Sequence, residues 1–316
     1  MKTWIDMHCD TLSELLLADS KETLQKNLLC VDVQRMEQTE MLAEFFACFA
    51  EVSDGNWEAG YEKAKKLITR MEEELKNNRN LKLLKTGGDV DRAEKSGEKL
   101  ALLTIEEGGI LNGKLERLDT FYQKGIRLIT LTWNYENCIG FPNSLNPRHM
   151  QKGLKPFGKQ VIEKMNTKGM LVDVSHLSDG GFWDCIRWSK KPVVASHSNA
   201  RALCPHPRNL SDEMLHAIGD KGGVAGLNFY PRFLRKDSPA QVSDLARHAM
   251  HMLQKAGEDA VALGTDFDGF AADQKWFHGI EDIESVWEMM KRAGFTERQL
   301  DKIALGNIKR VLHEVL

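Results

Sequence analysis

The sequence predicts an α/β protein, a closed (β/α)8 TIM barrel formed by a single domain over residues 1–316. Short apolar segments typical of strands recur eight times along the chain, and helical patterns separate most of them. Such alternation is typical of parallel strands joined by crossover helices. An open doubly wound sheet is the alternative, but it should carry a glycine-rich phosphate loop, and neither G-x-G-x-x-G nor a Walker A motif occurs.

The expected strands are short runs of Val, Ile, Leu, Ala and Phe. They cover residues 3–7, 43–50, 100–105, 126–132, 170–175, 193–196, 224–229 and 261–264. The clearest helix covers residues 57–77, where apolar residues recur at helical spacing. Further helices are expected at residues 11–18, 115–124, 156–168, 179–188, 211–221, 240–256, 280–292, 296–305 and 307–315.

Composition excludes several classes of protein. The net charge of -3 and the charged fraction of 28% are ordinary for a soluble domain, and no basic stripe with interleaved aromatic residues indicates a nucleic-acid partner. No stretch is apolar enough to span a membrane, and no secretory signal begins the chain, so a cytoplasmic location is expected. The six cysteines form no C-x-x-C pair and are expected to be reduced thiols.

His8 and Asp10 end the first expected strand. Residues two apart in a strand point to the same side, so an imidazole nitrogen and a carboxylate oxygen would enter one space. That pair suits a divalent cation such as zinc. Alone the signal is weak, because a surface histidine beside a helix-capping aspartate would give the same letters.

Later strand ends carry residues that could complete the same site. These are Glu107, His176, His197 and Asp266. Each has an alternative role. Glu107, beside Glu106, could be a helix-start or a solvated loop carboxylate. His176 could be a core histidine bonded to backbone, and His197 a turn residue. Asp266 and Asp268 resemble part of a calcium loop, although the EF-hand spacing is missing. Together they favour a metal site, because the carboxyl ends of barrel strands meet at one rim.

These residues lie in motifs that resemble those of the renal dipeptidase, or membrane dipeptidase, family of zinc peptidases. The motifs run in order over almost the whole chain: His8-Cys9-Asp10, Glu107-Gly108-Gly109, Pro156-Phe157-Gly158, Asp173-Val174-Ser175-His176, Ser196-His197-Ser198, Arg208-Asn209 and Gly264-Thr265-Asp266-Phe267-Asp268-Gly269. The resemblance implies an amidohydrolase-type barrel that holds two zinc ions and cleaves dipeptides, including those with a D-residue at the C-terminal position. A homodimer also rests on the resemblance alone.

The resemblance further implies a role for each residue. His8 and Asp10 would bind one zinc, His176 and His197 the other, and Glu107 would bridge them. Asp266 would serve as proton shuttle, Arg208 would hold the substrate carboxylate, and Tyr230 would contact the substrate. The reaction would be attack of a hydroxide shared by the two ions on the peptide carbonyl.

Trp133 departs from the family pattern. The family usually has a histidine there, which is thought to stabilise the oxyanion, whereas an indole offers one N–H donor and no charge. Either Trp133 or the amide of Asn134 could replace it, zinc alone could suffice, or Trp133 could simply be barrel packing. The departure leaves two rivals: another amidohydrolase, such as a lactonase, deaminase or phosphotriesterase, and a barrel that binds metal without catalysis.

Overall fold

A computed structural model describes residues 2–17, 22–237, 239–271, 274 and 276–316. Within them, one parallel sheet is closed into a ring in which β2 pairs with both β1 and β4, and β9 pairs with β1. The strands of the ring are β1 (Trp4–Cys9), β2 (Met41–Phe49), β4 (Lys99–Glu106), β5 (Ile126–Thr130), β6 (Leu171–Asp173), β7 (Val193–Ala195), β8 (Val224–Leu227) and β9 (Val261–Leu263). A further strand, β3 (Leu81–Leu83), pairs with the start of β4 outside the ring.

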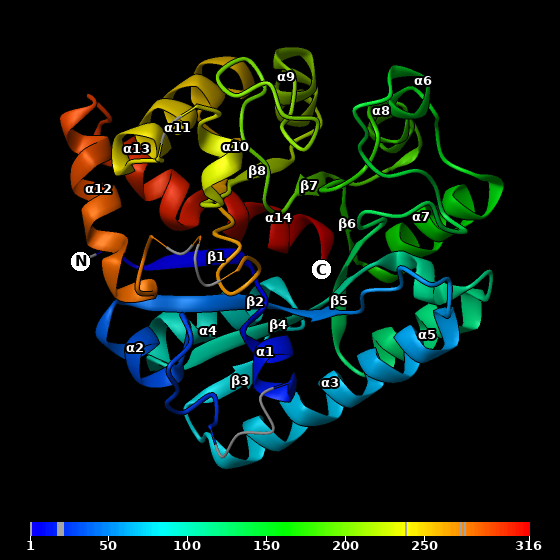
Figure 1. Cartoon of the computed structure of the whole chain (residues 1–316). Helices are drawn as coiled ribbons and strands as arrows, with labels where there is room; N and C mark the ends of the chain where they lie inside the picture. The colour runs from blue at the N-terminus through cyan, green and yellow to red at the C-terminus, as the bar shows by residue number, and fades with distance from the viewer. Residues whose placement is uncertain (1, 18–21, 238, 272–273, 275) are drawn as a thin grey trace.

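Helices surround the strands (Figure 1). They are α1 (Thr11–Leu17), α2 (Val33–Gln38), α3 (Trp57–Asn77), α4 (Gly87–Ser96), α5 (Leu115–Gln123), α6 (Pro147–Met150), α7 (Pro156–Lys168), α8 (Asp179–Trp188), α9 (Asp212–Asp220), α10 (Pro231–Leu234), α11 (Val242–Ala256), α12 (Ile283–Arg292), α13 (Glu297–Asp301) and α14 (Asn307–Val315). Shorter helical turns are η1 (Gly108–Leu111), η3 (Ile280–Asp282) and η4 (Lys302–Gly306). In the described part of the chain, none of these helices has the length and apolar character needed to cross a membrane.

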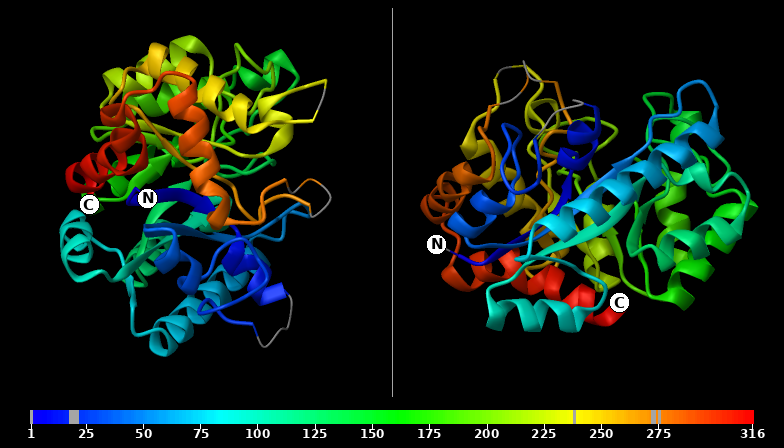
Figure 2. Two further views of the ribbon diagram at one scale, coloured as in Figure 1. Left: turned by 90° about the vertical axis from the view of Figure 1, so that its left-hand side faces the viewer. Right: turned by 90° about the horizontal axis from the view of Figure 1, so that it is seen from below.

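The barrel interior is closed at one end by α14. An apolar cluster takes residues from all strands of the ring, among them Leu102 and Leu128, and shares them with Ile308 and Leu312 of this helix. Figure 2 shows α14 (red) on the side of the molecule opposite to the loop that follows β9 (orange). Polar side chains can therefore gather only at the other end of the barrel, where the strands finish.

The ends of β9 and β7, which both flank β8, approach each other very closely next to that polar end. A Cβ atom at Gly264 would lie 1.7 Å from the carbonyl oxygen of Ser196, so no other residue fits between the ends of β9 and β7. Another glycine, Gly169, directly follows the last residue of α7. Its φ of 68° is the left-handed conformation in which helices commonly end, and glycine adopts it without strain. Gly264 thus permits the close approach of two strand ends, and Gly169 ends α7 just before β6 begins.

The predicted barrel is confirmed, and all of its expected strands lie within a few residues of the observed ones. The alternative of an open sheet is wrong, because Asp6 of β1 pairs with Leu263 of β9. The helices expected at 57–77, 156–168, 179–188 and 307–315 have those bounds. The expected end of the first helix at Ala18 lies outside the described residues. All six cysteines lie among the described residues, and no disulfide joins them.

Candidate metal centre and active site

Titratable side chains from five strands meet at the open end of the barrel. They come from β1, β4, β6, β7 and β9, either at the last residues of the strand or within three residues of its end. They are His8, Asp10, Glu106, His176, His197 and Asp266.

Two groups of donor atoms form within this cluster. His8 Nε2 lies 3.3 Å from Asp10 Oδ2 and 3.7 Å from Asp266 Oδ1. In the other group, the Nε2 atoms of His176 and His197 are 3.0 Å apart.

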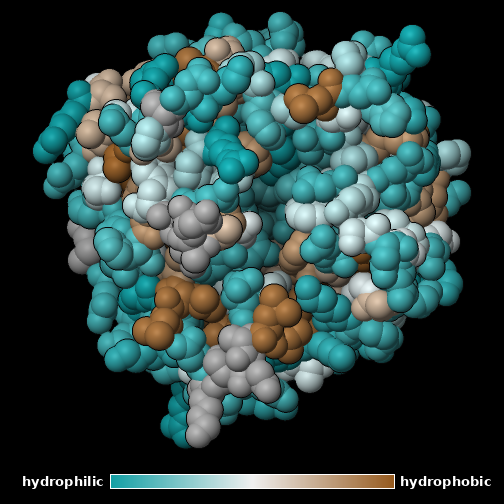
Figure 3. All heavy atoms as spheres, viewed as in Figure 1, coloured by the Kyte–Doolittle hydropathy of each residue, from teal (hydrophilic) through white to brown (hydrophobic). Residues whose placement is uncertain are grey.

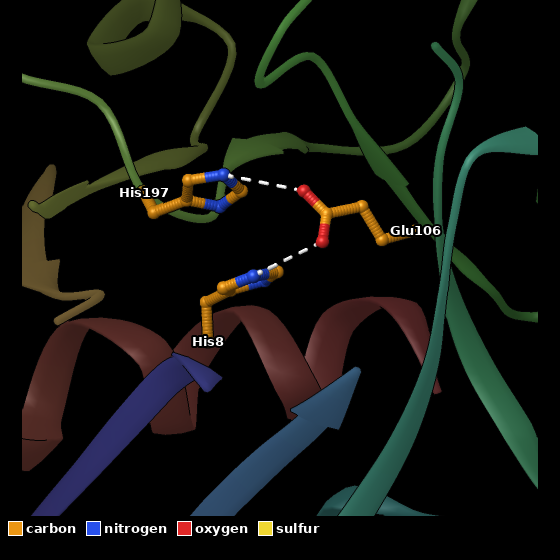
Figure 4. A group of neighbouring side chains, drawn as sticks. All are labelled: His8, Glu106 and His197. Carbon is orange, nitrogen blue, oxygen red and sulfur yellow. Dashed lines mark ion pairs between the residues drawn. The ribbon is translucent and has the colours of Figure 1, made fainter. Parts of the chain in front are cut away.

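Glu106 joins the two groups. Its Oε2 lies 3.4 Å from His8 Nε2, and its Oε1 lies 3.1 Å and 3.6 Å from the Nε2 atoms of His176 and His197. Figure 4 shows the carboxylate beside the rings of His8 and His197, with one oxygen toward each. A carboxylate with one oxygen toward each group has the arrangement needed to bridge two cations.

Several donor atoms of the cluster lack hydrogen-bond partners in the described part of the chain, and together they have the chemistry of a divalent-cation site. Both ring nitrogens of His8 and Oδ1 of Asp10 are buried and have no hydrogen-bond partner among the described residues. Leaving such atoms unpaired is costly, unless a further group binds there. Nitrogen and carboxylate oxygen donors within 4.8 Å of one another are the ligand set of zinc and similar ions.

Burial dominates the electrostatics of the cluster. It raises the pKa of Glu106 to about 7 and that of Asp266 to about 6, and it lowers the pKa values of His176 and His197 well below the usual range. Burial also opposes the charged form of His8, but the carboxylates of Glu106 and Asp10 outweigh it and raise the His8 pKa. The carboxylates thus favour a positive charge at the centre of the site. The imidazoles of His176 and His197 stay neutral, as histidine metal ligands must be.

Glu107, which was expected to bridge the metals, does not belong to the cluster, and Glu106 occupies that place instead. The backbone turns at Glu107, whose φ is 89°, so that its side chain leaves the barrel axis. Its Oε1 accepts hydrogen bonds from the backbone N–H of Gly109, at 2.8 Å, and from the amide of Asn137. Its Oε2 accepts one from the backbone N–H of Trp133, at 3.1 Å. Glu107 therefore secures the loops after β4 and β5.

A cavity of about 590 Å³ opens onto the cluster. Its floor includes Glu106, His176 and Asp266, and its walls include Trp133 and Tyr230. Figure 3 shows a hollow near the middle of the face seen in Figure 1, with mostly hydrophilic residues around it. The volume suits a small, polar substrate.

The chain matches the family model described as membrane dipeptidase (peptidase family M19) over residues 2–316. It belongs to this family. It is 36% identical over 245 residues to an uncharacterized protein in the pqqA 5′ region of Klebsiella pneumoniae, covering 74% of this chain and 89% of that protein. It is 31% identical over 297 residues to an uncharacterized dipeptidase of Schizosaccharomyces pombe, covering 89% of this chain and 71% of that protein. The chain is therefore a metallo-dipeptidase by family.

Solved structures share the fold. A metallopeptidase from Rhodobacter sphaeroides, crystallised with a phosphinate mimic of the dipeptide L-Ala-D-Ala, superposes with a TM-score of 0.89 at 24% identity, covering 100% of this chain and 99% of that chain. A dipeptidase of family M19 superposes with a TM-score of 0.90 at 24% identity, covering 99% of both chains. At this sequence identity, the two structures support the barrel fold of this chain and nothing further.

In this member of the family, Arg208 lies behind His197. Its terminal nitrogens donate to Ser198 Oγ, at 3.1 Å, and to the carbonyl oxygen of His197, at 3.0 Å, while Nε is buried with no partner among the described residues. Burial lowers the pKa of Arg208 to about 10. The guanidinium lies 5.3 Å from the ring centre of Phe233, a cavity-lining residue that also packs against Tyr230.

Trp133 and Asn134 form the wall of the cavity beside His176. The Trp133 ring packs against Phe49 with 4.9 Å between centroids and lies 6.2 Å from the His176 ring. Asn134 Oδ1 lies 3.2 Å from His176 Nδ1. In this orientation of the amide, the oxygen contacts the histidine and the N–H2 group is left to face a substrate. Whether that amide or Trp133 stabilises an oxyanion stays a prediction.

The sequence reasoning missed Glu106 and the polar residues behind the histidines. In the structure Glu106 is in phase with Leu102 and Leu100, which point into the barrel, but the sequence of this uniformly buried strand does not show which phase points inward. Asp173 and Ser196 were quoted as parts of motifs but given no role. Their contacts lie between strands, and strand pairing is not visible in a single motif.

Proposed function

We propose that this chain hydrolyses dipeptides with two divalent cations, zinc in the first instance. His8 and Asp10 would hold one cation, and His176 and His197 the other. The observation that carries the proposal is the Glu106 carboxylate, whose two oxygens face the two groups of donors separately. A single-cation site would not need both.

A bound pair of such ions lowers the pKa of water to about 7 and polarises a carbonyl group. Asp266 would move the proton. Its Oδ1 lies 3.7 Å from His8 Nε2, and its Oδ2 accepts a hydrogen bond of 3.0 Å from Asn228 Nδ2, which orients the carboxylate toward the cavity floor. Asp266 would accept the proton of the attacking water and deliver it to the departing amine, because an amine leaves readily only when protonated.

Arg208 would bind the free carboxylate of the dipeptide. The support is its unpartnered Nε beside the cavity wall, since a planar guanidinium matches a carboxylate well. Tyr230 would line the same side of the substrate. We extend to this chain the L,D stereochemistry of the mimic bound by the Rhodobacter sphaeroides metallopeptidase, so that a D-residue is accepted at the C-terminal position.

The test is metal analysis coupled to a substrate panel. The zinc-loaded protein is expected to hold two ions per chain and to cleave L,L and L,D dipeptides, while the chelated protein cleaves neither. Hydrolysis of lactones or phosphotriesters instead would favour another amidohydrolase. Two bound metals with no hydrolysis of any substrate would favour a metal-binding barrel. The cytoplasmic location and the homodimer stay predictions, which cell fractionation and size-exclusion chromatography can check.

A further inference from the structure

Asp173, the last residue of β6, is a buried carboxylate that touches neither group of donor atoms. Its Oδ1 accepts hydrogen bonds from the backbone N–H groups of Ser175, at 3.0 Å, and Ser196, at 2.9 Å. Its Oδ2 accepts hydrogen bonds from the hydroxyls of Thr130 and Ser196, both at 2.6 Å. The two N–H groups can only donate, and because a carboxylate has no proton to give, both hydroxyls donate to it as well.

This arrangement fixes the direction of the next hydrogen bond. Ser196 Oγ lies 2.7 Å from Nδ1 of His197, and either atom could be the donor. A hydroxyl has one proton, and Ser196 donates it to Asp173. Nδ1 of His197 must therefore carry the imidazole proton and donate it to Ser196 Oγ. The Nε2 atom, which faces Glu106 at 3.6 Å, is left with its lone pair.

We propose that Asp173 is a positioning residue that acts through Ser196 to hold His197 in the tautomer that can bind a metal through Nε2. The inference rests on the proposed metal site, but it concerns a proton on the free protein. Metal-binding histidines commonly have their second nitrogen bonded to a carboxylate, which fixes the ring and raises its basicity. Here a serine hydroxyl stands between the two.

His176 shows why a carboxylate, and not an amide, is needed to fix the tautomer of a histidine. Nδ1 of His176 faces the amide oxygen of Asn134 at 3.2 Å, and an amide can present either its oxygen or its N–H2 group. An ionised carboxylate presents acceptors only. The network at His197 therefore allows one proton arrangement, whereas the contact at His176 depends on how the Asn134 amide is turned.

Asp173→Asn reverses this arrangement with little change in shape. The asparagine oxygen can keep both backbone donors, so its N–H2 group faces the hydroxyls of Thr130 and Ser196. Ser196 then accepts that bond and turns its proton toward Nδ1 of His197. The imidazole proton is expected to move to Nε2, the nitrogen that should bind metal.

The experiment is long-range ¹H–¹⁵N NMR of the metal-free protein at pH 8, with the His197 signal assigned from a His197→Gln spectrum. The wild type should show the proton on Nδ1 and Asp173→Asn should show it on Nε2. Zinc affinity, measured by competition with a chelator, should fall about 10–100-fold in Asp173→Asn. Thr130→Val is the matched control, because it removes an equally short hydrogen bond to Asp173 without touching His197, and its tautomer should be that of the wild type.

A purely structural role for Asp173 predicts that both variants lose stability and neither changes the tautomer. A folded Asp173→Asn protein with the proton still on Nδ1 overturns the proposal. If that variant does not fold, Ser196→Ala decides, because it should leave His197 as a mixture of tautomers, and a pure Nδ1 form would overturn the proposal as well. No substrate is used, so a failure of the dipeptidase proposal would not be mistaken for a failure of this one.

Discussion

Exchanging Glu106 and Glu107 separately for glutamine tests the site most directly. The two residues are adjacent, both are buried, and only Glu106 faces the histidines. Glu106→Gln keeps the shape of the side chain but removes the charge between the two groups of donors. Two unit charges about 4 Å apart at an effective dielectric constant of about 20 interact by about 4 kcal/mol. Since about 1.4 kcal/mol corresponds to tenfold, zinc affinity should fall at least about 10³-fold.

Glu107→Gln should behave differently. Its carboxylate accepts hydrogen bonds from Gly109, Asn137 and Trp133, and glutamine can accept through one oxygen only. One buried donor would be left unpaired, which costs about 1–3 kcal/mol. This variant should therefore lose free energy of unfolding while it keeps its metal.

The assay loads each protein with zinc, dialyses it, counts the remaining metal by mass spectrometry, and measures the free energy of unfolding in urea. The reasoning is refuted if Glu107→Gln loses the metal and Glu106→Gln retains it. Equal metal loss in both variants would also refute it, because the geometry gives only one of these carboxylates to the site.

Three further substitutions test separate residues. Asp266→Asn should keep its metal content but lower kcat for dipeptides by about 10²–10⁴-fold, and turnover close to that of the wild type would remove Asp266 from the mechanism. Arg208→Ala should raise KM for dipeptides with a free carboxylate, and an equal rise for C-terminally amidated dipeptides would contradict its role. Burial lowers the pKa of His248 to about 4 from a usual 6.5, so the unfolded chain binds a proton that the folded chain does not, and stability should fall as the pH drops from about 6.5 to about 4. Urea unfolding should show a shallower loss over this range in His248→Gln, and an unchanged slope would count against the assignment.

The barrel could be predicted from the sequence because each strand is a short apolar run followed by a break. β4 and β5 are buried at every position, so they stand out from the helices around them. Because β4 is buried on both faces, its sequence does not show which of its residues point into the barrel. With no alternation of polar and apolar residues in β4, the letters alone did not decide whether Glu106 or Glu107 points inward.

The elements that were missed carry weak local signals. β3 has three residues, and α4 begins with Gly87-Gly88, which are poor helix formers. α4 is nevertheless formed, because Thr86 and Asp89 satisfy its first backbone groups and Val90 packs into the barrel cluster. The network around Asp173 was missed for a different reason, since its members come from β5, β6 and the end of β7, and only the pairing of these strands makes them neighbours.

The left-handed backbone at the rim has a consequence for engineering. His176, Asp266 and Asp268 have φ values of 65°, 63° and 63°, in a region that side chains with a Cβ rarely adopt. Each such residue costs about 1–3 kcal/mol, so the directions of these three side chains are maintained at the expense of the protein's thermal stability. We therefore expect Asp268→Gly to raise the melting temperature only if the hydrogen bonds that Asp268 accepts from Thr11 and Cys30 are worth less than the relieved strain. Selection for thermal stability alone would therefore tend to replace the left-handed residues that orient side chains toward the active site.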